Sequence, residues 1–114
     1  MDAFFQVTLI GSSGVVFDGP AEALSAPGGS GSFGVLANHA PMICALTTGI
    51  LSLRYQGQEQ YYLVGNGYLE VCDNRVAVLV SNIRTLETLE AGKQLLKEVN
   101  PWKAADRLAE AQSA

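Results

Sequence analysis

The sequence predicts a mostly β fold, an about ten-stranded β-sandwich followed by a short C-terminal two-helix hairpin. Twelve glycines among 114 residues supply frequent turns. Apolar and polar residues alternate at the period of two that half-buried strands show. After Val80 the composition changes to Leu, Glu, Lys and Gln, which favour helices. We therefore expect a sandwich domain at residues 1–84 and a shortened helical hairpin at residues 85–114.

Turn residues divide the first part of the chain into short strands. Gly11–Gly14 is the first predicted turn, and Asp18-Gly19-Pro20 is predicted to close the strand that follows it. Asp73-Asn74 is expected to join the last two strands as a hairpin. The predicted strands cover residues 5–10, 15–17, 21–26, 33–36, 42–46, 50–55, 61–64, 68–72 and 76–80. Many short strands at regular spacing are typical of a sandwich or barrel.

The C-terminal segment carries the start and stop signals of two helices. Thr85 or Thr88 is the expected N-cap of the first helix, and Asn100-Pro101 is expected to end it and begin the second. Both helices are too short to be stable alone, so they must pack on something. We expect the hairpin to be anchored by Leu89, Leu96, Val99, Trp102 and Leu108.

Charge and hydropathy exclude several classes of function. The net charge is −4 and the first basic residue is Arg54, which disfavours nucleic acid as a partner. Apolar runs are too short for a membrane helix, and no signal peptide is visible, so we expect no direct membrane insertion. Cys44 and Cys72 lie in strand-like runs and are interpreted as buried free thiols, with a disulfide between them as the alternative.

No motif for catalysis, metal binding or cofactor binding emerges. His39 is the only histidine, and neither cysteine has the spacing of a metal or nucleophile pair. The glycine-rich loop at residues 27–34 lacks the lysine and the following helix of a phosphate loop. The residues alone thus indicate a non-enzymatic interaction module without cofactor or metal. An unrelated sandwich that binds a small ligand or carbohydrate stays open, with candidate contacts at Tyr55, Tyr61, Tyr62 and Tyr68.

The segment Gly31–Met42 resembles the signature of F-type ATP synthase epsilon subunits, Gly-x-hydrophobic-Gly-hydrophobic-Leu-Pro-Gly-His-Ala-Pro, with Ala37-Asn38 in place of Pro-Gly. Five further blocks are similar to family segments: Val15–Gly19, Ser25–Gly28, Thr48–Leu51, Asn66–Val71 and Arg75–Leu79. The six blocks keep family order and spacing, and the resemblance covers residues 3–80.

The resemblance implies a ten-stranded sandwich with a helical hairpin, equivalent to the mitochondrial delta subunit. It also implies a non-catalytic rotor subunit of the central stalk of a proton- or sodium-translocating ATP synthase, which binds the gamma subunit and contacts the c-ring. The gamma interface that it implies consists of Gly11, His39, Met42 and Cys44. The loop that would face the c-ring consists of Gly28, Gly29, Ser30, Gly31, Ser32 and Phe33, with Ser32 at its tip.

Two departures from the family concern regulation. The tail after Val80 is short, so its contact with the alpha/beta hexamer and its control of ATP hydrolysis are expected to be weakened. Some members bind ATP through an Ile/Leu-Asp-x-x-Arg-Ala motif, but the matching segment, Leu86–Ala91, has Glu90 in place of the arginine. We therefore expect no ATP binding. The expected location is peripheral, on the cytoplasmic side of a bacterial inner membrane.

Overall fold

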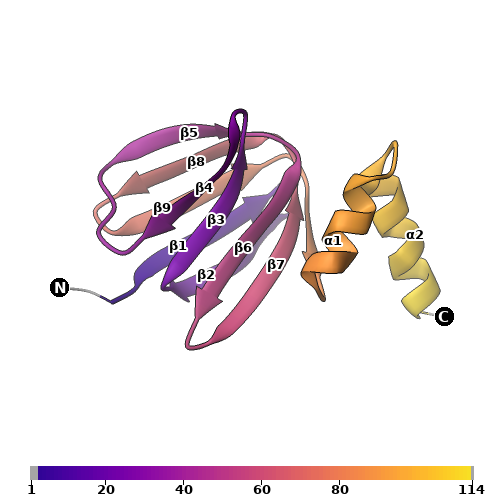
Figure 1. The fold of residues 1–114 in the computed structure, drawn as a ribbon, viewed down its shortest axis with the longest axis horizontal. Helices are drawn as coiled ribbons and strands as arrows, with labels where there is room; N and C mark the ends of the chain where they lie inside the picture. Colours follow the sequence, from indigo (N-terminus) through magenta and orange to yellow (C-terminus); the bar gives the residue numbers. More distant parts are fainter. Residues whose placement is uncertain (1–2, 114) are drawn as a thin grey trace.

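The computed structural model of the chain describes residues 3–113 and, in the last helix, side chains as far as Leu108. Within this range ten strands precede two helices, which confirms the predicted fold class (Figure 1). The elements are β1 (Phe5–Gly11), β2 (Gly14–Ala21), β3 (Ala23–Gly28), β4 (Gly31–Leu36), β5 (Met42–Leu46), β6 (Gly49–Tyr55), β7 (Gln58–Val64), β8 (Gly67–Cys72), β9 (Arg75–Val80), β10 (Ile83–Leu86), α1 (Leu89–Leu96) and α2 (Pro101–Ser113).

The strands form one continuous path that folds over into two layers. The strand order is β10-β7-β6-β3-β5-β8-β9-β1-β2, and β4 pairs with β3. Strands β3 and β5 share a single residue pair, Gly28 with Leu46, and the path turns from one layer to the other there. One layer therefore holds β3, β4, β6, β7 and β10, and the other holds β1, β2, β5, β8 and β9. The helical hairpin lies beyond one end of the sandwich (Figure 1).

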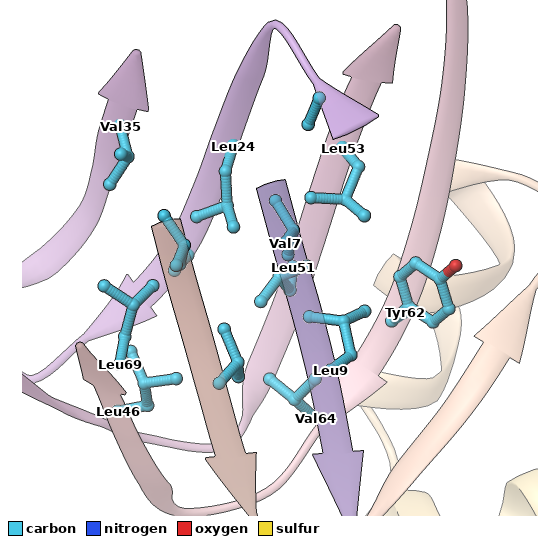
Figure 2. Close-up of a cluster of buried hydrophobic side chains, with 14 of the residues drawn as sticks. Val7, Leu9, Leu24, Val35, Leu46, Leu51, Leu53, Tyr62, Val64 and Leu69 are labelled. Carbon is cyan, nitrogen blue, oxygen red and sulfur yellow. The ribbon is translucent and has the colours of Figure 1, made fainter. Parts of the chain in front are cut away.

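The core lies between the two layers and is entirely apolar. Alternate residues of each strand point inward, so that Val7 and Leu9 of β1 meet Leu51 of β6 (Figure 2). All three of these side chains are fully buried. Burial of a Val or Leu side chain contributes about 1.5–3 kcal/mol. The core therefore gives this small sandwich most of its stability and fixes which residues of each strand face outward.

Strand β2 corrects the prediction that Asp18-Gly19-Pro20 forms a turn. These residues continue the strand, and Gly19 and Pro20 pair in register with Val7 and Gln6 of β1. Strand β2 ends the sheet path, so only one of its edges is bonded. Proline is tolerated on an edge strand because the N–H that it lacks can belong to the unbonded side.

Strand β10 was not predicted and lies where the first helix was expected to begin. Its four residues pair antiparallel with β7, so that Thr85 faces Tyr62 and Leu86 faces Tyr61. Thr85, one of the two predicted N-caps, is therefore a strand residue. The expected domain boundary between residues 84 and 85 falls inside β10, and the division into two domains stays a prediction.

The helix starts follow local capping chemistry. The Thr88 hydroxyl accepts a hydrogen bond from the Ala91 N–H at 3.1 Å, which confirms Thr88 as the N-cap of α1. The Asn100 side-chain oxygen accepts from the Lys103 N–H at 3.1 Å, as expected for the start of α2. Pro101 then occupies the first helical position, where its missing N–H costs nothing.

A second, smaller apolar cluster attaches the hairpin to the sandwich. It consists of Leu63, Leu86, Leu95, Ala104 and Ala105, with Ile50, Tyr61 and Trp102 packed against it. Gly92 is buried at the contact, and a Cβ there would lie 2.7 Å from Leu86 Cδ1 and 2.9 Å from Ile50 Cδ1. The glycine therefore lets α1 approach the sheet closely. An ion pair between Arg84 of β10 and Asp106 of α2, 2.6 Å long, adds a polar link.

The structure corrects the anchor residues predicted for the hairpin. Trp102 packs against the second cluster and Leu89 is half-buried, but Leu96, Leu108 and Val99 are exposed, Val99 completely at 105%. The physical reason is that α1 ends at Leu96, so Val99 lies in the connecting loop rather than on a helical face. Leu95, not Leu96, points to the sandwich, and the alanines of α2 complete the contact.

Candidate interaction surfaces

A shallow hollow of about 430 Å³ lies along the edge where β4 and β5 diverge. It is lined by Gly28, Gly29, Ser30, Gly31, Ser32, Phe33, Gly34, His39, Met42 and Cys44. The structure therefore brings together the whole loop predicted to face the c-ring and three of the four residues predicted to contact gamma. We call this surface the β4–β5 hollow.

The glycine-rich loop is a tight hairpin between β3 and β4. Gly28 pairs with Gly31, so the tip is Gly29-Ser30. Gly31 has a backbone φ of 125°, which residues other than glycine rarely adopt. Ser32, predicted at the tip, instead pairs with Pro27 inside the strand ladder. The prediction missed this because the sequence does not show which of three neighbouring glycines closes the turn.

Contacts with the start of β6 hold this hairpin in place. The Thr47 N–H donates to the Pro27 carbonyl at 3.0 Å, and the Thr47 hydroxyl donates to the Gly28 carbonyl at 3.4 Å. A Cβ on Gly49 would lie 2.5 Å from Pro27 Cβ, so the chain after β5 packs directly against the base of the hairpin. The tip is therefore exposed but its base is fixed.

The other wall of the hollow comes from β5 and the loop before it. The Nδ1 of His39 lies 2.7 Å from the Ala40 carbonyl oxygen, so Nδ1 carries the hydrogen of this bond and the ring is held against its own loop. Met42 and Cys44 alternate on β5 toward the sandwich interior, and Met42 packs against the main core. The wall is thus apolar, with one oriented imidazole at its end.

Gly11 lies away from the other three residues predicted to contact gamma. Gly11 is the last residue of β1 and pairs with Gly14. His39 lies near the opposite end of β1, because Asn38 donates its N–H to the Asn74 side chain, which in turn donates to the Phe4 carbonyl. A Cβ on Gly11 would lie 2.7 Å from Ile83 Cγ2. The structural requirement at this position is therefore close packing against the segment that leads to the hairpin.

Exposed apolar side chains lie on the outward face of the layer that contains β5, β8 and β9, and the sequence did not predict them. Ile43, Tyr68 and Leu79 are 73%, 61% and 57% exposed. They lie on β5, β8 and β9, whose alternate residues Leu46, Leu69 and Val78 are buried. The strands of a sheet with one solvent-facing side usually alternate apolar with polar residues. These strands have apolar residues on both sides, and that pattern could have indicated an exposed apolar face.

Metal-ligating and thiol side chains were searched among the described residues. No group of three or more His, Cys, Asp or Glu side chains within the described residues could hold a metal ion. Both cysteines are free, but Cys72 is exposed, so the prediction of a buried thiol is wrong for it: Leu69 and Val71 of β8 point inward and Cys72 points outward. The negative charge of Asp73, aided by partial desolvation, raises the pKa of the Cys72 thiol.

The four tyrosines considered for a ligand site do not gather into one patch. Tyr62 is buried in the core, where burial raises the pKa of its hydroxyl, and Tyr68 is on the outward face of β8. Tyr61 donates a hydrogen bond to Glu59, which raises the pKa of Tyr61, and Tyr55 packs edge-on against Phe4. The aromatic platform expected of a carbohydrate site is therefore absent from the described part of the chain.

Comparison with known proteins gives this architecture a family. Residues 4–85 match the family model described as the beta-sandwich domain of the ATP synthase delta/epsilon chain. The chain belongs to the ATP synthase delta/epsilon chain family. A curated ATP synthase epsilon chain of Leptospira borgpetersenii is 33% identical over 103 residues, which cover 89% of this chain and 81% of that protein. One of Pelotomaculum thermopropionicum is 36% identical over 94 residues, or 82% of this chain and 68% of that protein.

Solved structures extend the family likeness to nearly the whole chain. A chain in the mitochondrial ATP synthase of Euglena gracilis, solved with its c-ring, has a TM-score of 0.71 and 25% identity, and the match covers 99% of this chain and 66% of that chain. A chain in the central stalk and c-ring of Tetrahymena thermophila ATP synthase has a TM-score of 0.59 at 19% identity and shares the fold. Within the described residues of this chain, no helix has the length and hydropathy needed to cross a membrane.

Proposed function

We propose that this chain is a non-catalytic rotor subunit in the central stalk of a proton- or sodium-translocating F-type ATP synthase, where it binds gamma, contacts the c-ring and couples ion flow to ATP synthesis. The observation that carries the proposal is the family match across the whole sandwich. The curated relatives named above are ATP synthase epsilon chains. A role in contact rather than chemistry agrees with an apolar core and a surface of hollows and apolar patches.

Two parts of the β4–β5 hollow serve two partners in this proposal. The Gly29-Ser30 tip of the β3–β4 hairpin contacts the c-ring, and the wall formed by His39, Met42 and Cys44 contacts gamma. The tip carries almost no side-chain bulk, which lets another backbone approach closely. Gly11, at the far end of β1, contacts gamma only if gamma spans the length of the sandwich.

Stiffness is the physical requirement for such a subunit. A contact that transmits torque must not deform under load. Two hydrogen-bonded sheet layers over a close-packed core deform little. The loop tip is fixed at its base through Thr47 and Gly49. The rotor contact is therefore part of the rigid body rather than a flexible appendage.

Regulation and location complete the proposal. In this proposal the C-terminal helices contact the alpha/beta hexamer, and their inhibition of ATP hydrolysis is weakened. We expect no ATP binding, because Glu90 would repel the phosphates. The chain is peripheral to the membrane as part of the complex, on the cytoplasmic side of a bacterial inner membrane.

A calorimetric titration of gamma from the same source with the full chain tests the proposal. A one-to-one complex is expected, and Cys44→Glu, which places a charge in the apolar wall of the hollow, should weaken it at least tenfold. Cys44→Ser is the matched control, since it changes one atom without adding charge. A folded gamma that does not bind the unmodified chain would refute the assignment, whereas binding unaffected by Cys44→Glu would move gamma away from the hollow.

A further inference from the structure

Two sulfur-bearing side chains of β5 point the same way at the open edge of this strand. Met42 pairs with Val71 and Cys44 pairs with Leu69, and both partners on β8 are buried between the layers. Directly paired residues point to the same face of a sheet, so Met42 and Cys44 both point to the interior side of β5. They are only half-buried, because β4 diverges from β5 here and leaves the β4–β5 hollow. A thioether and a thiol therefore enter one hollow from neighbouring positions.

The spacing of the two residues suits a shared metal ion. Alternate residues of a strand lie roughly 6.6 Å apart along its axis. Two sulfur ligands of one ion lie at most about 4.6 Å apart, which is twice a metal–sulfur bond of about 2.3 Å. Methionine has three rotatable side-chain bonds, which let its sulfur cover the difference. The Cys44 thiol donates to the Ala45 carbonyl at 3.7 Å, and that bond engages the hydrogen of the thiol rather than the lone pairs of its sulfur.

An imidazole that lines the same hollow supplies a third donor. The Nδ1 of His39 carries the hydrogen of its 2.7 Å bond to the Ala40 carbonyl, so in the neutral ring the lone pair is on Nε2. Metal-bound histidines commonly make this second bond, which fixes the tautomer and the orientation of the ring. The His39 N–H also donates to the Leu36 carbonyl at 3.2 Å, which holds the backbone of the loop. The imidazole is therefore oriented before any ion binds.

The three donors select a soft monovalent cation. Thiolate and thioether sulfur favour Cu(I), and imidazole suits copper as well. The described residues that line the hollow include no Asp or Glu, so it lacks the carboxylate oxygens that Ca²⁺ and Mg²⁺ prefer. One thiolate balances the single charge of Cu(I), so the occupied site is neutral beside an apolar wall. A divalent ion would keep a net positive charge there, which is costly in apolar surroundings.

We propose that His39, Met42 and Cys44 form a three-coordinate site for Cu(I) in the β4–β5 hollow. One donor is a thioether, so the site is not a group of three His, Cys, Asp or Glu side chains. On binding, the S–H bond of Cys44 breaks, an S–Cu bond forms, and one proton passes to solvent. The Met42 sulfur and His39 Nε2 donate lone pairs and lose no proton. Copper stays cuprous throughout, so the step needs no oxidant or reductant.

Anaerobic titration of the full chain with Cu(I), in competition with the chromogenic chelator bicinchoninate, tests the inference. One ion should bind per chain. Cys44→Ser should weaken binding by about a hundredfold, because a neutral hydroxyl replaces the thiolate, and Met42→Leu and His39→Gln should each weaken it by about tenfold. Cys72→Ser is the matched control, since it removes the exposed thiol of β8 and should leave the affinity unchanged. Between roughly pH 6 and pH 7 the affinity should rise about tenfold, because one proton is released per ion.

X-ray absorption at the copper edge identifies the ligands directly. Two sulfur atoms and one nitrogen should surround copper in the unmodified chain, and one sulfur should be missing in Met42→Leu. A chain that binds no Cu(I), or binds it equally well after Cys44→Ser, would overturn the inference. Loss of binding in Cys72→Ser, or copper held by thiols of two chains, would overturn it as well. Thermal unfolding of each metal-free variant near that of the unmodified chain shows that a lost affinity is not lost folding.

The metal site and the rotor role are tested separately. The titration uses the isolated chain, so a failure to bind Cu(I) would overturn the metal site and leave the binding of gamma untouched. A failure of gamma to bind would overturn the rotor role and leave the metal site standing.

Discussion

Gly67 is a position where the backbone of β9 leaves no room for a side chain. A Cβ there would overlap the carbonyl oxygen of Leu79 and approach Cα of Val80 to 2.7 Å. Because the obstacle is backbone, no side-chain rotation can relieve it. We expect Gly67→Ala to lower the free energy of unfolding by about 3 kcal/mol, the upper part of the range for overpacking. Urea denaturation measures this loss.

Gly29→Ala is the matched control for that substitution. Gly29 lies at the hairpin tip, and no atom lies within 4 Å of where its Cβ would be. The free energy of unfolding of the Gly29→Ala variant should differ from that of the unmodified chain by less than about 0.5 kcal/mol. Equal effects of the two substitutions would show that glycine content, rather than the close approach at Gly67, governs stability.

Cys72 should be a slow nucleophile for an exposed thiol. The charge of Asp73 raises its pKa, and the thiolate is the reactive form, so a smaller fraction reacts at a given pH below the pKa. We expect Asp73→Asn to lower the pKa of the thiol and to speed its alkylation at roughly pH 8. The difference should vanish at high pH, where both thiols are ionised. Mass spectrometry of the alkylated peptide gives the rate.

The substitution is chosen so that the turn survives. Asp73 has a φ of 51°, and asparagine tolerates this left-handed region at least as well as aspartate. Asp106→Asn removes a carboxylate on α2 and should leave the alkylation rate of Cys72 unchanged. A rate that does not respond to Asp73→Asn would mean that the charge of Asp73 does not control the reactivity of the thiol.

Individual residues show what sequence patterns can and cannot resolve. Alternation on β8 would have placed Cys72 outward with Glu70, but the strand-like run alone suggested burial. Val99 matched a helical stripe only on the assumption that α1 continued past Leu96. Both errors have one physical cause: facing direction depends on where an element begins and ends.

At the scale of elements, α2 depends on its N-cap. Asn100→Ala removes the acceptor of the Lys103 N–H and should cost about 1 kcal/mol. Amide exchange in α2 should rise roughly fivefold, since this helix is attached mainly through Trp102, Ala104, Ala105 and one exposed ion pair. Exchange measured by mass spectrometry, with the sandwich as internal reference, reads out the change.

Thr85→Ala provides the comparison within the same segment. Thr85 was predicted, beside Thr88, as a candidate N-cap of the first helix, but it lies in β10 and caps no helix. Its substitution should leave exchange in α2 unchanged. An effect of Thr85→Ala as large as that of Asn100→Ala would contradict the assignment of the cap.

Elements were predictable where local chemistry decides and were missed where pairing decides. The Asp73-Asn74 turn was predictable, because both residues tolerate positive φ, which they adopt at 51° and 59°. Strand β10 was missed because its four residues become a strand only by pairing with β7. Strand β2 runs through Gly19-Pro20 only because it is an edge, and edge position is a property of the whole sheet.

At the scale of the molecule, the sequence predicted the architecture, and the residues that contact gamma and the c-ring stay predictions. The structure adds that His39, Met42 and Cys44 line one hollow with the glycine-rich loop. The pairing of the exposed residues Tyr68 and Leu79 could not be foreseen in the same way, since they come from two different strands. Sequence alternation says which residues share a face, but the register decides which of them are neighbours.

The central claim is that this chain works inside an ATP synthase as a rotor subunit. Affinity purification of the tagged full chain from membranes of its source, followed by quantitative mass spectrometry, tests this most directly. We predict that gamma and the c-ring subunit co-purify in fixed proportion to the chain and are lost together in the Cys44→Glu variant. Recovery of the folded chain alone, or with proteins unrelated to ATP synthase, would contradict the claim.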